Sequence, residues 1–166
     1  EIIKASGCYI LLLSCPICYK IFKESYKLTG IYVVHHSVFF DELIHSQRLH
    51  VSKDESRRLA YHDPCELGRG CGIYDAPRSA VGAMGTLVEA AGNREESICC
   101  GGSLGSLSLN YEKRRDITLN SLRNLTVDNP DTIVTACPLC QSTFSKYSEV
   151  PVQDIAQVLD SSILVR

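Results

Sequence analysis

The sequence predicts an α/β fold in which parallel, Rossmann-like βαβ layers carry a pseudo-twofold internal repeat. Short apolar segments, typical of strands, alternate along the chain with longer amphipathic segments, typical of helices. Alternation of this kind favours parallel strands joined by right-handed crossovers. A sequence motif also occurs twice, once near each end of the chain, and this recurrence indicates the repeat. The 166 residues are enough for one domain or two small lobes with a hydrophobic core.

The first half of the chain contains two strand–helix pairs. Residues 9–14 (YILLLS) predict a buried strand, and apolar side chains at helical spacing predict a helix from 16 to about 28. Gly30 ends that helix, as glycine commonly does just after a helix C-terminus. A second strand is expected at 31–35 and a second helix from 37 to about 46.

The second half continues the alternation after a polar segment, 46–58, which we expect to be a connection. A glycine-rich loop is expected at 68–72. The other expected elements are strands ending at 62 and covering 86–90, 131–136 and 150–152, a turn at 93–97, and helices starting at 77 and covering 104–125, 138–147 and 155–163.

The recurring motif is YILLLSCPICYKIF near the start of the chain and DTIVTACPLCQSTF near its end. Each copy is followed by a short strand and an amphipathic helix. We therefore expect residues 1–50 to be the C-terminal part of a first repeat and residues 51–166 to be a complete second repeat, in two lobes or one compact unit. The residues that match at one constant offset are Cys15 and Cys137, Pro16 and Pro138, Cys18 and Cys140, and Phe22 and Phe144.

Composition narrows the functional classes. The formal net charge is -2, so the sequence predicts neither a nucleic acid nor an anionic membrane surface as a partner. No segment approaches the ~20 apolar residues that a transmembrane helix needs. The first residue is Glu1 and the single methionine is Met84, so we expect a fragment, a processed product or part of a longer chain.

Nine cysteines are the unusual feature of the composition. Their odd number argues against a closed disulfide framework, and a chain of this size does not need one. Two C-x-x-C pairs and one adjacent pair stand beside glycine and proline. This clustering favours a metal site in a reducing compartment over thiols scattered through the core.

Three kinds of motif bring cysteines to strand ends. In C-P-x-C, Pro138 suits the first turn of a helix, whose N-terminus favours thiolate. In CCGG, Gly101 and Gly102 let the backbone bend until both sulfurs face one object, and they expose N–H groups to it. In YHDPCELGRG, Arg69 is placed to offset thiolate charge, and His62 is expected to support the site without ligating it. Since ligands bind at the carboxyl ends of parallel strands, we expect five cysteines to meet there: Cys65, Cys99, Cys100, Cys137 and Cys140.

This pattern, C-x33-CCG-x35-C-x-x-C headed by HDPC…GR, resembles the CCG or cysteine-rich domain family over almost the whole chain. That family includes the cysteine-rich subunit of heterodisulfide reductase and the iron–sulfur subunits of glycolate, lactate and anaerobic glycerol-3-phosphate oxidation systems. In the heterodisulfide reductase branch each complete set carries a noncubane [4Fe–4S] cluster, so the resemblance implies that the five cysteines are its ligands. Cys15 and Cys18 match the tail of a preceding set and are candidates for a partial second site.

The sequence leaves alternatives open at these positions. The C-x-x-C at 137–140 alone would fit a thioredoxin-like dithiol, and four of the five cysteines would suit a tetrahedral zinc site. Cys8 is expected to be a strand thiol, and Cys71 a loop thiol or a spare ligand. His35 and His36 are expected to be a structural or exposed pair in preference to ligands or a proton relay.

The resemblance implies an iron–sulfur electron-transfer subunit of a heterodisulfide-reductase-like oxidoreductase complex, not active alone. Any hard chemistry would belong to the cluster, since no catalytic side chain can be argued from the sequence. The expected partners are other subunits with flavin, iron–sulfur or quinone-linked centres. The expected location is the cytoplasm or, through those partners, the inner face of the membrane. The alternative is a non-catalytic, zinc-stabilised module that holds subunits of a redox complex together.

Overall fold

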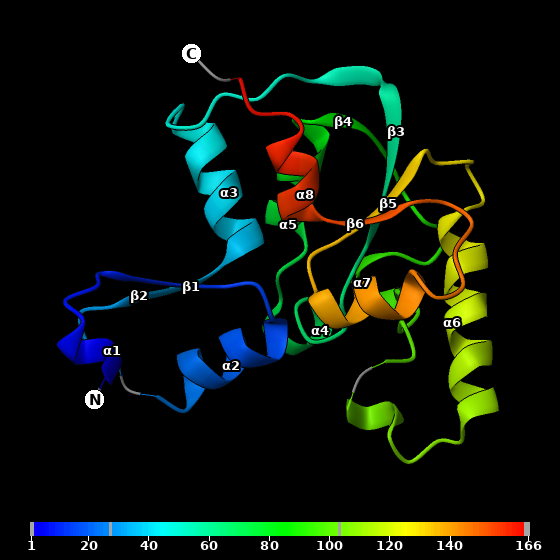
Figure 1. Cartoon of the computed structure of the whole chain (residues 1–166), viewed down its shortest axis with the longest axis horizontal. Coiled ribbons are helices and arrows are strands. Elements are labelled where there is room, and N and C mark those ends of the chain that lie inside the picture. Colours follow the sequence, from blue (N-terminus) through cyan, green and yellow to red (C-terminus); the bar gives the residue numbers. More distant parts are fainter. Residues whose placement is uncertain (1, 27, 103, 165–166) are drawn as a thin grey trace.

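Two parallel sheets and the helices around them form the scaffold of the protein (Figure 1). The computed structural model describes residues 2–26, 28–102 and 104–164. The first elements are α1 (Ile2–Ala5), β1 (Ile10–Leu13), α2 (Pro16–Glu24), β2 (Tyr32–His35) and α3 (His36–His45). The next are β3 (Asp54–His62), α4 (Gly68–Cys71), α5 (Asp75–Gly82), β4 (Gly85–Val88) and the 3-10 helices η1 (Arg94–Glu96) and η2 (Leu104–Ser106). The last are α6 (Tyr111–Leu125), β5 (Thr132–Thr135), α7 (Pro138–Phe144), β6 (Val152–Asp154) and α8 (Ile155–Asp160).

The smaller sheet pairs β1 with β2, and the larger sheet has the order β4-β3-β5-β6. Every pairing between these strands is parallel. Helix α2 connects β1 to β2 and α7 connects β5 to β6, as crossover helices do in parallel sheets. The parallel α/β class that the alternation predicts is confirmed.

The sequence repeat corresponds to a repeated order of elements. The series β1-α2-β2-α3 recurs as β5-α7-β6-α8, and the offset that aligns the two C-P-x-C motifs also aligns β1 with β5 residue for residue. At the end of the second strand of each series, His35 pairs with Leu13, and Asp154 pairs with Thr135. Each is also the N-cap of the helix that follows. His35 and Asp154 therefore hold equivalent places in the two series.

The two series meet through helices α3, α5 and α8, which lie side by side (Figure 1). Phe40 of α3 packs against the buried core of the larger sheet, which includes Leu59 and Val158. His36 Nε2 lies 3.1 Å from Asp154 Oδ1, so the start of α3 is linked directly to the start of α8. These contacts fix the smaller sheet against the larger one.

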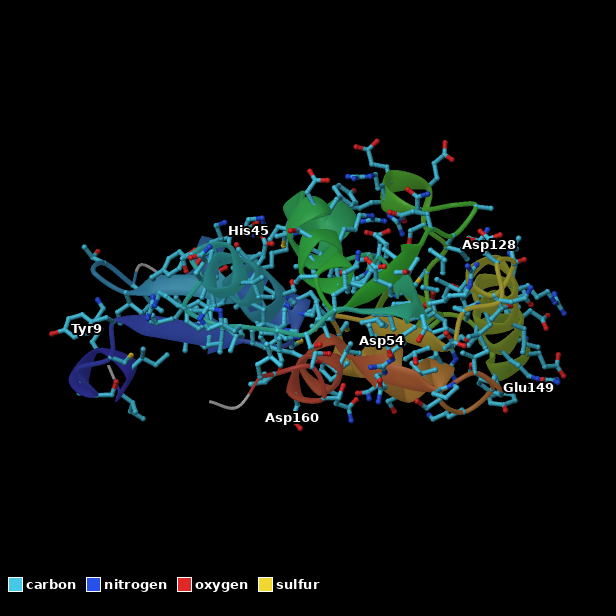
Figure 2. All side chains as sticks on the ribbon, turned by 90° about the horizontal axis from the view of Figure 1, so that it is seen from above. Tyr9, His45, Asp54, Asp128, Glu149 and Asp160 are labelled. Atoms are coloured by element: carbon cyan, nitrogen blue, oxygen red, sulfur yellow. The ribbon has the colours of Figure 1, made fainter. Side chains whose placement is uncertain are left out.

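Strand β1 is half exposed, whereas the sequence predicts a buried strand. Ile10 and Leu12 expose 44% and 45% of their surface. In the described part of the chain β1 pairs with β2 alone, so only one of its edges is covered by a strand. Tyr9, just before β1, projects from one end of the elongated molecule, and Asp128 and Glu149 lie toward the other end (Figure 2).

Strand β3 begins at Asp54, inside the segment that the sequence predicts to be a connection. Its first half is polar because it is exposed, so apolar alternation gives no signal there. Hydrogen bonds to the next strands hold this half in place. Arg58 N donates to Asp131 Oδ2 at 2.7 Å, and Arg57 Nη2 donates to Gln153 Oε1 at 2.7 Å.

Three other elements differ from their expected bounds. Gly68–Cys71 forms a helical turn instead of a loop, closed by Gly72 in the left-handed conformation at φ 69°. Helix α2 ends at Glu24, before the predicted end, and position 27 lies outside the described residues. Helix α6 starts at Tyr111, well after residue 104. Among the helices in the described ranges, none is long and apolar enough to cross a membrane.

Candidate metal centre

The five predicted cysteines occupy loops and helix starts at one end of the larger sheet. Cys65 follows β3, the pair Cys99–Cys100 follows η1, and Cys137 directly follows β5 as the N-cap of α7. Cys140 lies in the first turn of α7 and is buried. Four of the five line one narrow cleft together with Pro16 and Ile17 of α2. The N-terminus of α2 therefore closes the cleft from the smaller sheet.

The thiols form a continuous series of side-chain contacts. The order of contacts is Cys65, Cys99, Cys100, Cys140 and Cys137. This series joins three separate segments of the sequence. It does so because β3 and β5 are adjacent and parallel, which brings the segments after their carboxyl ends together. The structure thus places all five sulfurs in one group.

Each thiol changes the acidity of its neighbour. Contact with Cys99 and burial raise the pKa of Cys65, and contacts with Cys100 and Cys137 raise the pKa of Cys140 well above its usual value. The hydrogen bond with Cys140 instead lowers the pKa of Cys137 to about 7. Neighbouring thiols cannot all ionise without a cation, since buried like charges repel. The group is therefore suited to a centre of high positive charge.

The two glycines of CCGG direct backbone donors at sulfur. Gly101 N donates to Cys99 Sγ and Gly102 N donates to Cys100 Sγ, both at 3.4 Å. Gly101 adopts φ 82°, and a Cβ atom there would lie 2.7 Å from the carbonyl oxygen of Arg114. Only glycine fits this turn without displacing α6.

Nine free thiols are present in the described residues, and the cysteines form no disulfide there. Within the same ranges, no group of three or more His, Cys, Asp or Glu side chains is arranged to hold a single metal ion. Residues 59–145 match the family described as the CCG cysteine-rich domain. The chain belongs to the CCG cysteine-rich domain family. The family expected from the cysteine spacing is confirmed.

Curated relatives of this CCG chain are named as redox proteins. A probable membrane-anchored ferredoxin of Chromohalobacter salexigens is 32% identical over 138 residues, which cover 79% of this chain and 21% of the relative. An EtfAB:quinone oxidoreductase of Syntrophomonas wolfei is 32% identical over 166 residues, covering 90% and 23%. The dihydromethanophenazine:CoB–CoM heterodisulfide reductase of Methanosarcina acetivorans has a subunit that is 27% identical over 179 residues, covering 98% and 44%. The chain spans less than half of each of these proteins.

Solved structures resemble the CCG chain only loosely. An aspartate racemase of Picrophilus torridus aligns with a TM-score of 0.45 and 13% identity, over 98% of this chain and 66% of that one.

The Cys65 loop of the CCG domain is fixed by the residue before Pro64. The buried carboxylate of Asp63 forms a two-point ion pair with Arg78 and accepts a hydrogen bond from Arg94 N at 2.8 Å. Its carbonyl oxygen accepts a hydrogen bond from Ser97 Oγ at 2.9 Å. Because Arg94 and Ser97 lie in the segment that leads to Cys99, one aspartate positions two parts of the thiol group.

His62 and Arg69 also bind this leading segment. His62 Nε2 lies 3.2 Å from the carbonyl oxygen of Ile98, and its Nδ1 lies 3.4 Å from Thr135 Oγ1. Burial lowers the pKa of His62 to about 4, so the ring is neutral at pH 7. Arg69 Nη1 donates to the carbonyl oxygens of Glu95 and Ser97 at 3.0 and 2.7 Å, so its hydrogen bonds go to the loop backbone and not to a thiol.

Helix α6 supplies two supports that the sequence interpretation missed. Thr118 Oγ1 donates to the carbonyl oxygen of Cys100 at 2.8 Å, and Ser121 Oγ donates to that of Ile98 at 3.2 Å. Both hydroxyls are buried on the inner face of the helix. A signal for them exists: they are polar residues three apart on a face that also carries Leu122 and Leu125.

The remaining candidate residues lie around the cleft. Cys15 and Cys18 contact each other at the start of α2, where Cys18 is exposed. Cys71 is half-buried, and burial raises its pKa. Cys8 Sγ lies 3.7 Å from the carbonyl oxygen of Ile3, far along the chain from the CCG motif. His35 is buried and lies 2.9 Å from Ser37 Oγ through Nδ1.

Proposed function

We propose that this chain is the cluster-binding part of an iron–sulfur electron-transfer subunit in an oxidoreductase complex. The proposed ligands of a [4Fe–4S] cluster are Cys65, Cys99, Cys100, Cys137 and Cys140. The observation that carries the proposal is the continuous series of contacts among the five thiols. A cubane [4Fe–4S] cluster takes four cysteine thiolates, so a set of five favours a noncubane cluster.

The chemistry of the site fits such a group. All five donors are thiols, which are the usual protein ligands of iron–sulfur clusters. The N–H groups of Gly101 and Gly102 already point at sulfur, and hydrogen bonds to sulfur raise the reduction potential of a cluster. When bound, the cluster would supply one-electron transfer. The chain's own residues hold the sulfurs, supply these N–H groups and surround the site with buried side chains such as Phe144.

The remaining parts of the chain follow from the repeat. We propose that residues 1–50 are the C-terminal part of a first CCG-type repeat and that residues 51–166 are a complete second one. Cys15 and Cys18 would then belong to the first repeat and could serve a partial second site. The names of the relatives, which include a quinone oxidoreductase and a heterodisulfide reductase, support partners with flavin, iron–sulfur or quinone-linked centres.

Anaerobic reconstitution tests the proposal. The chain should take up about four iron and four sulfide ions and give an EPR signal in one redox state. Cys100→Ser should lower the iron content by at least about half, because Cys100 links the two halves of the thiol series. Cys71→Ser is the matched control and should keep the iron content of the wild type.

The competing result is also defined. One zinc ion per chain without sulfide, with folding lost on chelation, would reject the iron–sulfur proposal in favour of a zinc-stabilised structural module.

A further inference from the structure

A groove of about 290 Å³ lies between α6 and α7, on the outer side of the CCGG turn. Gly101 and Gly102 form part of its wall, while their N–H groups point to the cysteine sulfurs. The groove is therefore separated from the thiols by a single turn of backbone. Neither the proposed cluster nor the helix packing accounts for it.

Three cations line this groove: Arg114 and Arg115 on α6 and Lys146 just after α7. No carboxylate is among its described lining residues, and none of the three cations forms an ion pair within the described ranges. Arg114 Nε is buried and has no hydrogen-bond partner in the described part of the chain. A buried donor without a partner is uncommon and indicates that something is missing from the site.

Two tyrosines complete the groove. Tyr111 and Tyr147 come from the two sides, and their hydroxyl groups lie 2.9 Å apart. One hydroxyl donates to the other, so the second O–H remains available to an acceptor. The positive charges of Arg115 and Arg114 act on this pair, since both are close enough to affect the Tyr147 hydroxyl. Guanidinium, ammonium and phenol donors therefore converge on one concave space.

We propose that this groove binds the oxyanion of a small molecule, either a carboxylate or a phosphate. Arginine donors match both groups geometrically, and three unpaired cations in a recess attract negative charge. The recess and its tyrosine hydroxyls favour a small ligand over the flat acidic surface of a protein. The site goes beyond the proposed electron-transfer role and does not require that the cysteines carry a cluster.

Anion titrations test the site. Malonate and inorganic phosphate are titrated into the anaerobically prepared chain at constant ionic strength, and binding is measured by isothermal calorimetry and by NMR shifts of the Gly101 and Gly102 amides. Arg115→Gln and Lys146→Gln, both at exposed positions, should each weaken binding about tenfold, because each removes a charged donor. Arg123→Gln removes the same charge from an exposed position of α6 outside the groove and should change affinity less than about twofold.

The outcomes separate the possibilities. Saturable binding of either anion with the predicted variant pattern supports the site and identifies which oxyanion it prefers. Equal weakening by Arg123→Gln would show attraction to general positive charge and overturn the proposal. Binding of an acidic peptide with neither small anion bound would also overturn it, in favour of a protein-docking surface. Loss of iron from the cysteines would leave the titration unaffected, so the two proposals fail independently.

Discussion

Arg78 and Asp63 face each other as a buried two-point ion pair next to the thiol group. Arg78 Nη1 lies 2.7 Å from Asp63 Oδ1, and Arg78 Nη2 lies 2.6 Å from Asp63 Oδ2. The two side chains expose only 6% and 2% of their surface. Arg78 also binds Glu89 through Nε at 2.7 Å, so the guanidinium joins α5, the end of β3 and the segment after β4. The pair thereby sets where the Cys65 loop leaves the sheet.

Removing one member of this pair should destabilise the protein strongly. Arg78→Met leaves the buried carboxylate of Asp63 unpaired, so the free energy of unfolding should fall by about 3–5 kcal/mol. Urea denaturation of wild type and variant in the same metal state measures the change. Asp75→Asn is the control, because Asp75 pairs with Arg94 at an exposed site and its loss should cost at most about 1 kcal/mol. Equal costs for both variants would contradict the assigned role of Asp63.

Gly101 should not tolerate a side chain. Gly101→Ala meets both the left-handed φ of 82° and the carbonyl oxygen of Arg114, so we expect a loss of more than about 1 kcal/mol and a lower iron content after reconstitution. Gly82→Ala is a matched control. No atom lies within 4 Å of a Cβ atom at Gly82, which ends α5, so alanine there should be neutral or stabilising by about 0.5–1 kcal/mol. Full iron content in Gly101→Ala would contradict the described geometry of the turn.

Stability should decrease as the pH falls below about 6.5, in part because of His35. Burial lowers the pKa of His35 from 6.5 to about 3, so between these values the unfolded chain binds a proton that the folded chain does not. His35 therefore contributes stability at pH 7 that is lost toward pH 3, on the order of 2 kcal/mol between pH 7 and 5. Urea denaturation at several pH values measures the slope.

His35→Gln isolates this contribution. The variant should be less stable than wild type at pH 7, since His35 binds Ser37 Oγ and the carbonyl oxygen of Ser14. Its stability should also decrease less steeply with falling pH. An unchanged pH slope in the variant would show that the proton uptake on unfolding occurs at other groups, such as His62, whose pKa burial also lowers.

The parts of the site that were predictable are those that carry a local sequence signal. Cysteine spacing, the prolines and the glycines of CCGG identified the segments, and the alternation of strands and helices implied that their ends meet. The contacts of Cys65 with Cys99 and of Cys100 with Cys140 agree with that inference. They depend only on β3 and β5 being parallel neighbours, which the βαβ pattern implies.

The unpredicted parts depend on contacts between distant segments. Arg69 was expected near thiolates, but its geometry is set by carbonyl groups 26 and 28 residues away in sequence. The apolar run of β1 looked buried because sequence shows hydrophobicity but not how many neighbouring strands cover a strand. The polar start of β3 at Asp54 is stabilised by side chains of other strands, so its own composition carries no periodic signal.

Asp154 should contribute more to stability than an ordinary helix cap. It accepts a hydrogen bond from Ala156 N at 2.9 Å at the start of α8, and its carboxylate also lies 3.1 Å from His36 Nε2. Asn110 caps α6 through Lys113 N at 2.9 Å without such a link to another helix. Asn110→Ala should therefore cost about 1 kcal/mol, which is typical of a lost cap.

The comparison of caps isolates the bond between the two series of elements. Asp154→Ala should cost at least about 1 kcal/mol more than Asn110→Ala, because it also leaves the buried His36 ring without this partner. Asp154→Ser keeps a capping oxygen but is too short to reach His36, so its cost should lie between the other two. Urea denaturation at pH 7 gives the three values. If Asp154→Ala costs no more than Asn110→Ala, the contact between His36 and Asp154 does not hold α3 against α8, and apolar packing around Phe40 would account for that junction by itself.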